Sequence, residues 1–300
     1  MESNIASSQY TLSDDQPKPE VPVVRCSSWA NFMREVESLD PNLYVMSVWR
    51  GQARSSDGLR ATFFREEEAW DDPIRAEDLP DARSHPDLLL EAFKVAQSTV
   101  NGTQSLSDDR WWAIARHAGL KSPLLDWTMS PYVAAFFAFR SRAGRSDECA
   151  VFRLNWAVAR NTSQKLLETD PKAENPYDDC LVLIVPKGLD NPPMRAQNGL
   201  FTRLYPPHID IVTWVTVHCA GPQPTSPGLN RYGDDYTLTK YTLPCSARDA
   251  ALDSLHRMNV HASALFPDLH GAAEFANGSR ESSVRTGFLR LFPHERIPHI

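Results

Sequence analysis

Residues 124–139 read LLDWTMSPYVAAFFAF, and this stretch decides how the middle of the chain folds. Its first half alternates the polar residues Asp126, Thr128 and Ser130 with an apolar residue at each position between them. Successive side chains of an extended strand point to opposite faces of a sheet. We therefore predict a strand whose polar face forms the rim of a cleft and whose apolar face packs into the core.

The second half of this stretch predicts a buried helix over residues 132–141, because it is apolar nearly all round. Ser130 followed by Pro131 is a typical helix start, with Ser130 as the N-cap and Pro131 at the first helical position. Capping and a role in a polar site are therefore alternative interpretations of Ser130. Thr128 has no such local role, and we interpret it as a site residue.

A second motif, Trp49-Arg50-Gly51-Gln52, lies at the end of an apolar run at residues 44–48, and we predict a strand over residues 44–49 that places Arg50 at its end. The planar guanidinium of Arg50 suits a phosphate or a carboxylate, and Gly51 permits close approach of a ligand or of another backbone. The alternative is an Arg50–Asp126 ion pair that only ties two elements together. We expect the Asp126 carboxylate to be largely buried and bonded to Arg50 or His117, since an unpaired buried charge is costly.

His117 and Gln197 are two further candidate site residues. His117 ends a helix predicted over residues 109–118, where Gly119 supplies the stop, and a helix C-terminus favours a charged imidazole. It is either such a cap or a catalytic group. Gln197 precedes a strand predicted from Gly199 and can orient a ligand through hydrogen bonds, although it cannot act as a general base. The alternative is a glutamine bonded to backbone at a strand edge.

Strand and helix patterns mix along the chain without a regular βαβ alternation, which predicts an α+β fold with small central sheets flanked by helices. Further strands are predicted at residues 21–24, 149–154, 180–186, 211–217 and 236–243, with 180–186 a central strand because it lacks polar alternation. We predict a disordered segment at 1–20, a single domain at 21–276 and a polar tail at 277–300.

Composition is that of a globular protein, with 42% hydrophobic and 23% charged residues. The formal net charge of −7 argues against non-specific binding along nucleic acid. The five cysteines include no C-x-x-C pair, so we expect free thiols and no metal site. No stretch reaches the roughly 18 apolar residues of a membrane span, and no signal peptide is evident. We expect a soluble cytoplasmic protein without a membrane partner.

Several motifs in fixed order resemble the FRG domain family over roughly residues 24–205. They are the aromatic-Arg-Gly of Trp49–Gly51, a helix ending in His-x-Gly-Leu at His117, Leu-Leu-Asp-Trp-Thr at residues 124–128, Ser-Pro at 130–131, and Gln-x-Gly-x-Phe at 197–201. The chain departs from the family pattern in having Trp49 where Phe or Tyr is usual. It also has Ser-Pro at 122–123 where Thr-Arg is frequent.

This resemblance implies a distant relationship to the ADP-ribosyltransferase fold, in which NAD binds between two small sheets. It implies a catalytic set of Arg50, His117, Asp126, Thr128 and Gln197, with Gln197 where that fold carries a late-strand Glu. It also implies NAD, as a substrate, held by Arg50, Gly51, Gln52, Ser130, Tyr132 and Phe201. FRG domains resemble parts of bacterial defence or toxin systems.

Three functions are therefore open. The first is an NAD-dependent ADP-ribosyltransferase or NAD glycohydrolase of such a system, acting on an acceptor that the sequence does not identify. The second is a non-catalytic module that binds a nucleotide or another phosphate-bearing small molecule, since a neutral Gln197 cannot supply negative charge. The third is a hydrolase that uses His117, Asp126 and Thr128.

Overall fold

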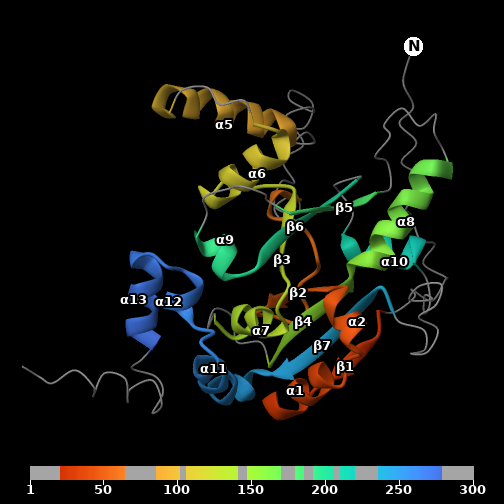
Figure 1. Ribbon diagram of the computed structural model, residues 1–300, viewed down its shortest axis with the longest axis vertical. Helices are drawn as coiled ribbons and strands as arrows, with labels where there is room; N and C mark the ends of the chain where they lie inside the picture. Colours follow the sequence, from red (N-terminus) through yellow and green to blue (C-terminus); the bar gives the residue numbers. More distant parts are fainter. Residues whose placement is uncertain are drawn as a thin grey trace, which may run out of the picture.

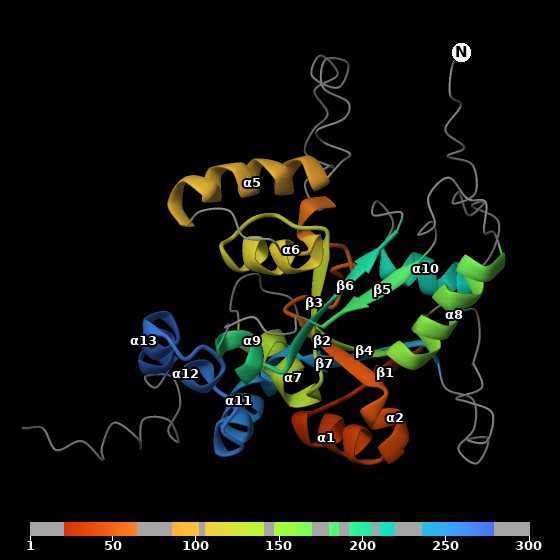
Figure 2. The same cartoon turned by 45° about the horizontal axis from the view of Figure 1, so that its top comes forward.

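The computed structural model describes residues 21–64, 86–101, 106–140, 147–169, 180–185, 192–205, 210–219 and 236–278. The described strands form one seven-stranded mixed sheet with helices packed around it (Figures 1 and 2). This confirms the predicted α+β class. The segment predicted as disorder at 1–20 lies outside the described residues, and so does the predicted tail of 277–300 from residue 279 on. The first two residues of that tail, 277 and 278, instead end the helix Leu269–Gly278.

The sheet has the strand order β1-β7-β4-β2-β3-β6-β5, and β1 with β7 is its parallel pair. The strands are β1 (Val23–Arg25), β2 (Ser47–Gln52), β3 (Leu124–Thr128), β4 (Glu148–Asn155), β5 (Leu181–Ile184), β6 (Gly199–Leu204) and β7 (Leu238–Pro244). The helices of one turn or more are α1 (Trp29–Glu37), α2 (Pro41–Val45), α5 (Pro86–Asn101), α6 (Asp108–His117), α7 (Pro131–Arg140), α8 (Trp156–Thr169), α9 (Pro192–Ala196), α10 (Ile211–His218), α11 (Arg248–Arg257), α12 (Ala262–Leu265) and α13 (Leu269–Gly278).

The two halves of the sheet separate between β2 and β3. β2 pairs with β4 along its whole length, from Ser47 to Gln52, and β3 pairs with β6 along its whole length. Between β2 and β3, by contrast, the register consists of the single pair Trp49 and Thr128. The sheet therefore opens on one side of this pair, next to Arg50 and Asp126.

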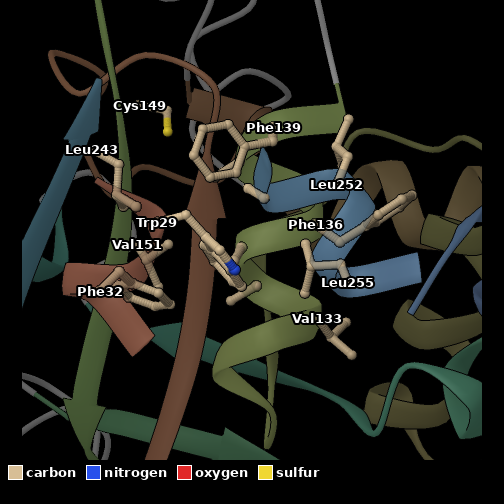
Figure 3. Packing of buried hydrophobic residues seen from close by; sticks show 14 of the residues in the cluster. Trp29, Phe32, Val133, Phe136, Phe139, Cys149, Val151, Leu243, Leu252 and Leu255 are labelled. Carbon is tan, nitrogen blue, oxygen red and sulfur yellow. The ribbon is translucent and has the colours of Figure 1, made fainter. Parts of the chain in front are cut away.

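Helix α7 is the buried centre of one face of the molecule, as its apolar sequence predicts. It packs with α1 and α11 against β2, β4 and β7 in one hydrophobic cluster, in which Figure 3 shows Phe139 of α7, Trp29 of α1 and Leu255 of α11. On the opposite face α8 and α10 pack against Val48, Leu125 and other strand residues. A third cluster joins α5 and α6 to β3, β5 and β6.

Three sequence predictions differ from the structure. Residues 211–217 form helix α10 instead of a strand, because the Asp210 carboxylate caps the amide of Thr213 at 2.7 Å and tertiary packing overrides the β-branched run. Residues 44–45 belong to α2, which Asp40 caps and Pro41 starts. β5 lies at the sheet edge instead of its centre, and it is apolar because helices cover both of its faces.

None of the helices in the described part of the chain is long and apolar enough to cross a lipid bilayer.

Candidate functional site

A cleft lies where the sheet opens between β2 and β3. It consists of two adjoining cavities of about 350 Å³ each. Helix α7 borders the first cavity, helix α6 borders the second, and both are closed by the segments around Gln197 and Phe266. Figures 1 and 2 show β3 between α6 and α7, with α9 and α12 beside them. We call these two cavities together the central cleft; their volume is in the range of ligand-binding pockets.

Four of the five predicted catalytic residues, Arg50, Asp126, Thr128 and Gln197, line the central cleft. Of the predicted ligand-binding residues, Gly51 and Phe201 also line it. The lining is aromatic as well as charged: Phe137 and Phe266 are partly exposed, whereas Trp49, Trp127 and Phe201 border the cleft from the core and are almost fully buried. The topology thus brings four distant parts of the sequence into one place.

Arg50 reaches from β2 to β3 across the opening. Its Nη1 atom donates a 2.8 Å hydrogen bond to the main-chain carbonyl oxygen of Asp126 and lies 3.6 Å from the carboxylate Oδ2. If the antiparallel register continued from Trp49 and Thr128, Gly51 would lie opposite Asp126. The guanidinium of Arg50 therefore occupies the place of a lost strand–strand hydrogen bond while it borders the cleft.

Asp126 has a stronger partner that the sequence did not indicate, Arg116 of α6. Both carboxylate oxygens of Asp126 accept from this guanidinium, Oδ1 from Nε at 2.6 Å and Oδ2 from Nη2. The Nη1 atom of Arg116 donates in addition to Ser122 Oγ at 2.9 Å and Thr62 Oγ1 at 3.1 Å. This fork-to-fork pairing fixes the plane of the carboxylate.

The Asp126 carboxylate is ionised but not buried. Desolvation raises the pKa of Asp126, but the charge and hydrogen bonds of Arg116, and then the charge of Arg50, outweigh it and lower the pKa below its ordinary value of 3.8. The expected pairing with Arg50 is present, whereas the expected burial is wrong, since 49% of the side-chain surface is exposed. The group faces the cleft because β3 leaves its partner strand at this point.

The hydroxyl of Thr128 connects β3 to the turn before β6. Thr128 Oγ1 donates to the carbonyl oxygen of Gln197 at 2.6 Å and accepts from the amide of Ser130 at 3.1 Å. The side-chain amide of Gln197 in turn donates to the carbonyl oxygen of Leu265 at 3.0 Å. Gln197 thus lies in a turn two residues before β6 and joins this turn to α12.

Ser130 is the N-cap of α7, because its Oγ accepts from the amide of Val133 at 3.3 Å. Gly51 is required by packing: a Cβ atom there would lie 1.9 Å from the carbonyl oxygen of Ala134. Gln52 is buried, and its side-chain amide donates to the carbonyl oxygen of Gly58 at 3.1 Å. Ser130, Gln52 and Tyr132 are not among the cleft-lining residues. Desolvation, followed by the charge of Glu37, raises the pKa of the Tyr132 phenol.

Helix α6 ends at His117, and Gly119 follows with a φ of +96°, as the sequence predicts for a helix stop. The side chain of His117 lies outside the part of the chain that the structure describes, so its role stays a prediction.

Arg140 is a second cleft residue that sequence reasoning missed. It is the last residue of α7 and lines the first cavity. Its Nε and Nη2 atoms donate to the two carboxylate oxygens of Glu274 at 2.6 and 2.5 Å, and its guanidinium carbon lies 4.4 Å from the ring centroid of Phe266. A charged residue that ends an otherwise apolar helix was the signal that could have pointed to it.

Chemically, the central cleft combines guanidinium groups, aromatic rings and one fixed carboxylate. Guanidinium groups and aromatic rings are suited to phosphates and to planar rings, and the carboxylate to a hydroxyl or a developing positive charge. Among the described residues, no group of three or more His, Cys, Asp or Glu side chains is placed to hold a metal ion.

Comparison with known proteins agrees with these motifs. No curated protein and no solved structure matches the chain. Residues 46–147, which contain β2, β3 and α7 and with them Arg50, Arg116, Asp126 and Arg140, match the model of the FRG domain. About a third of the chain, residues 46–147, is therefore similar to the FRG domain.

Proposed function

We propose that the FRG domain of this chain binds NAD in the central cleft and cleaves the bond between nicotinamide and ribose, as an ADP-ribosyltransferase-like enzyme of a bacterial defence or toxin system. The observation that carries the proposal is the opening of the sheet between β2 and β3, lined by Arg50, Asp126 and aromatic rings. In the ADP-ribosyltransferase fold NAD binds between two sheets, and this opening offers the corresponding place. The biological setting rests on the FRG domain alone.

In the proposed reaction the bond between the ribose C1′ and the nicotinamide nitrogen breaks, and nicotinamide leaves as a neutral molecule. The ribose carbon then forms a bond to an acceptor nucleophile or to the oxygen of water, which releases a proton. Positive charge develops on the ribose during this step, and the ionised carboxylate of Asp126 is the group that would stabilise it. Arg50 would hold the diphosphate and an aromatic side chain the nicotinamide ring.

Binding without turnover is a second candidate, and the pairing of Asp126 favours it. Two arginines already lie against this carboxylate, which reduces the negative charge it can offer to a substrate. Gln197 is neutral and donates its side-chain amide to Leu265. The hydrolase alternative has less support, because the hydroxyl hydrogen of Thr128 is directed to the carbonyl oxygen of Gln197.

Incubation of the purified protein with NAD tests the proposal, with release of nicotinamide and thermal stabilisation measured on the same preparation. We expect nicotinamide release that Arg50→Ala abolishes. Arg54→Ala is the matched control, since Arg54 is an exposed arginine four residues along the chain that pairs with Asp57 outside the cleft. Stabilisation by NAD without release would support the binding module instead. Neither stabilisation nor release would overturn both candidates.

A further inference from the structure

We infer that Arg140 is a second anion-binding residue of the central cleft and that it contacts the phosphate groups of the ligand together with Arg50. The inference deepens the proposed function, because it names the side chain that recognises the anionic part of a nucleotide. It concerns a residue within the FRG match that is oriented by a helix outside that match.

Arg140 is placed at the cleft by the helix that precedes it. The other residues of α7 are apolar, and seven of them are buried, so the helix is fixed by its packing. Its last side chain is 27% exposed and lines the same cavity as Arg50, Gly51 and Asp126. A guanidinium at such a position is only partly hydrated, and its attraction for an anion exceeds that of a fully exposed group.

Two neighbours hold the guanidinium of Arg140 in one orientation. Glu274 of α13 occupies the edge formed by Nε and Nη2, and the ring of Phe266 lies 4.4 Å from the guanidinium carbon. The ring of Phe137 lies 6.0 Å from the same carbon and meets Phe266 edge-on. Among the described residues the Nη1 atom has no hydrogen-bond partner, so this end of the fork remains for a ligand.

The chemistry of Arg50 explains why a second arginine is needed. Arg50 already donates to the Asp126 carbonyl and lies 3.6 Å from the Asp126 carboxylate, which repels a phosphate. Among the described residues, the central cleft is lined by four cationic side chains, Arg50, Arg116, Lys121 and Arg140, and by the single carboxylate of Asp126. Arg140 offers its remaining donors beside two aromatic rings that can contact a planar base. A nucleoside diphosphate group matches this arrangement.

The test measures the affinity of the full chain for inorganic pyrophosphate and for ADP by calorimetry. We expect Arg140→Gln to weaken both by roughly tenfold or more, the scale of one charge-assisted hydrogen bond. Arg140→Lys keeps the positive charge but lacks the planar guanidinium, so its affinity for each probe should lie between those of the wild type and of Arg140→Gln. Arg248→Gln is the matched control: it removes the same charge from a side chain that is 18% exposed, donates to the Phe139 carbonyl and does not line the cleft. This variant should bind as wild type does.

Equal losses in Arg140→Gln and Arg248→Gln would overturn the inference, because the effect would then be one of net charge. Wild-type binding by a folded Arg140→Gln protein, or no binding of either probe by the wild-type protein, would also overturn it. If Arg140→Gln does not fold, the affinities of Arg140→Lys and Arg248→Gln for the two probes are compared instead. A loss in Arg140→Lys alone would then support the inference. Arg140-dependent binding of pyrophosphate by a protein that neither binds nor consumes NAD would refute the proposed function and leave this inference intact.

Discussion

Arg50 Nη1 donates a 2.8 Å hydrogen bond to the main-chain carbonyl oxygen of Asp126, across the point at which β2 and β3 separate. The bond satisfies a backbone acceptor that the opened sheet no longer pairs. The same guanidinium borders the cleft, so the structural and the ligand-binding interpretations of Arg50 are compatible. The site and the opening of the sheet therefore depend on one side chain.

The pairing of Asp126 with Arg116 should contribute to stability. We expect Asp126→Asn to lower the free energy of unfolding by roughly 1–3 kcal/mol, because it removes the negative charge and one of the two oxygens that accept from the largely buried Arg116 guanidinium. A double-mutant cycle with Arg116→Gln, measured by urea denaturation, should give a coupling of about 1 kcal/mol. The exposed pair Arg54–Asp57 is the control, with an expected coupling near zero. Equal couplings in the two cycles would contradict the prediction.

The low pKa of Asp126 predicts an acid-sensitive contribution to stability. Its folded-state pKa lies below the ordinary value of 3.8 because of Arg116 and Arg50, so the unfolded chain binds a proton first as the pH falls. The contribution is complete above about pH 5, declines as the pH falls through the unfolded pKa, and is lost once the pH passes below the folded pKa. The stability difference between wild type and Asp126→Asn should therefore shrink when thermal unfolding is followed from pH 7 to pH 3. A constant difference would show that the carboxylate charge is irrelevant.

Gly51 should not tolerate a side chain. A Cβ atom would lie 1.9 Å from the carbonyl oxygen of Ala134, so Gly51→Ala must displace α7 or β2. This displacement should lower the free energy of unfolding by at least about 2 kcal/mol. In the control Gly58→Ala the nearest atom to the new Cβ is Asp210 Oδ2 at 3.5 Å, an ordinary contact, and stability should change by less than about 0.5 kcal/mol. Melting temperatures of both variants provide the comparison, and a stable Gly51→Ala protein would refute the packing of α7 on β2.

Thr128 should act on stability through its hydroxyl. Thr128→Val removes the hydrogen bond to the Gln197 carbonyl and the oxygen that accepts from the Ser130 amide. Because Thr128 is only 4% exposed, we expect the free energy of unfolding to fall by about 1–3 kcal/mol. Thr128→Ser keeps the hydroxyl and should be closer to wild type. If Thr128 were instead a catalytic nucleophile, Thr128→Val would lose turnover at an unchanged melting temperature, and that result would revive the hydrolase alternative.

The sequence by itself determined the features that depend on neighbouring residues. The alternation in residues 124–128 placed Asp126 and Thr128 on one face of β3 and Leu125 and Trp127 in the core on the other. Ser130 and Gly119 marked the start of α7 and the stop of α6. Local periodicity and capping act over a few residues, so a single sequence records them directly.

Only the tertiary structure decided which distant groups meet at Asp126 and in the cleft. The Arg116 guanidinium, the separation of β2 from β3 and the Arg140–Glu274 pair, 134 residues apart, carry no local pattern. They arise because α6, α7 and α13 are each positioned by packing against the sheet or one another, and packing is a property of the whole core. For the same reason the β-branched residues 211–217 became helix α10, where Ile211, Trp214 and Val215 are buried together.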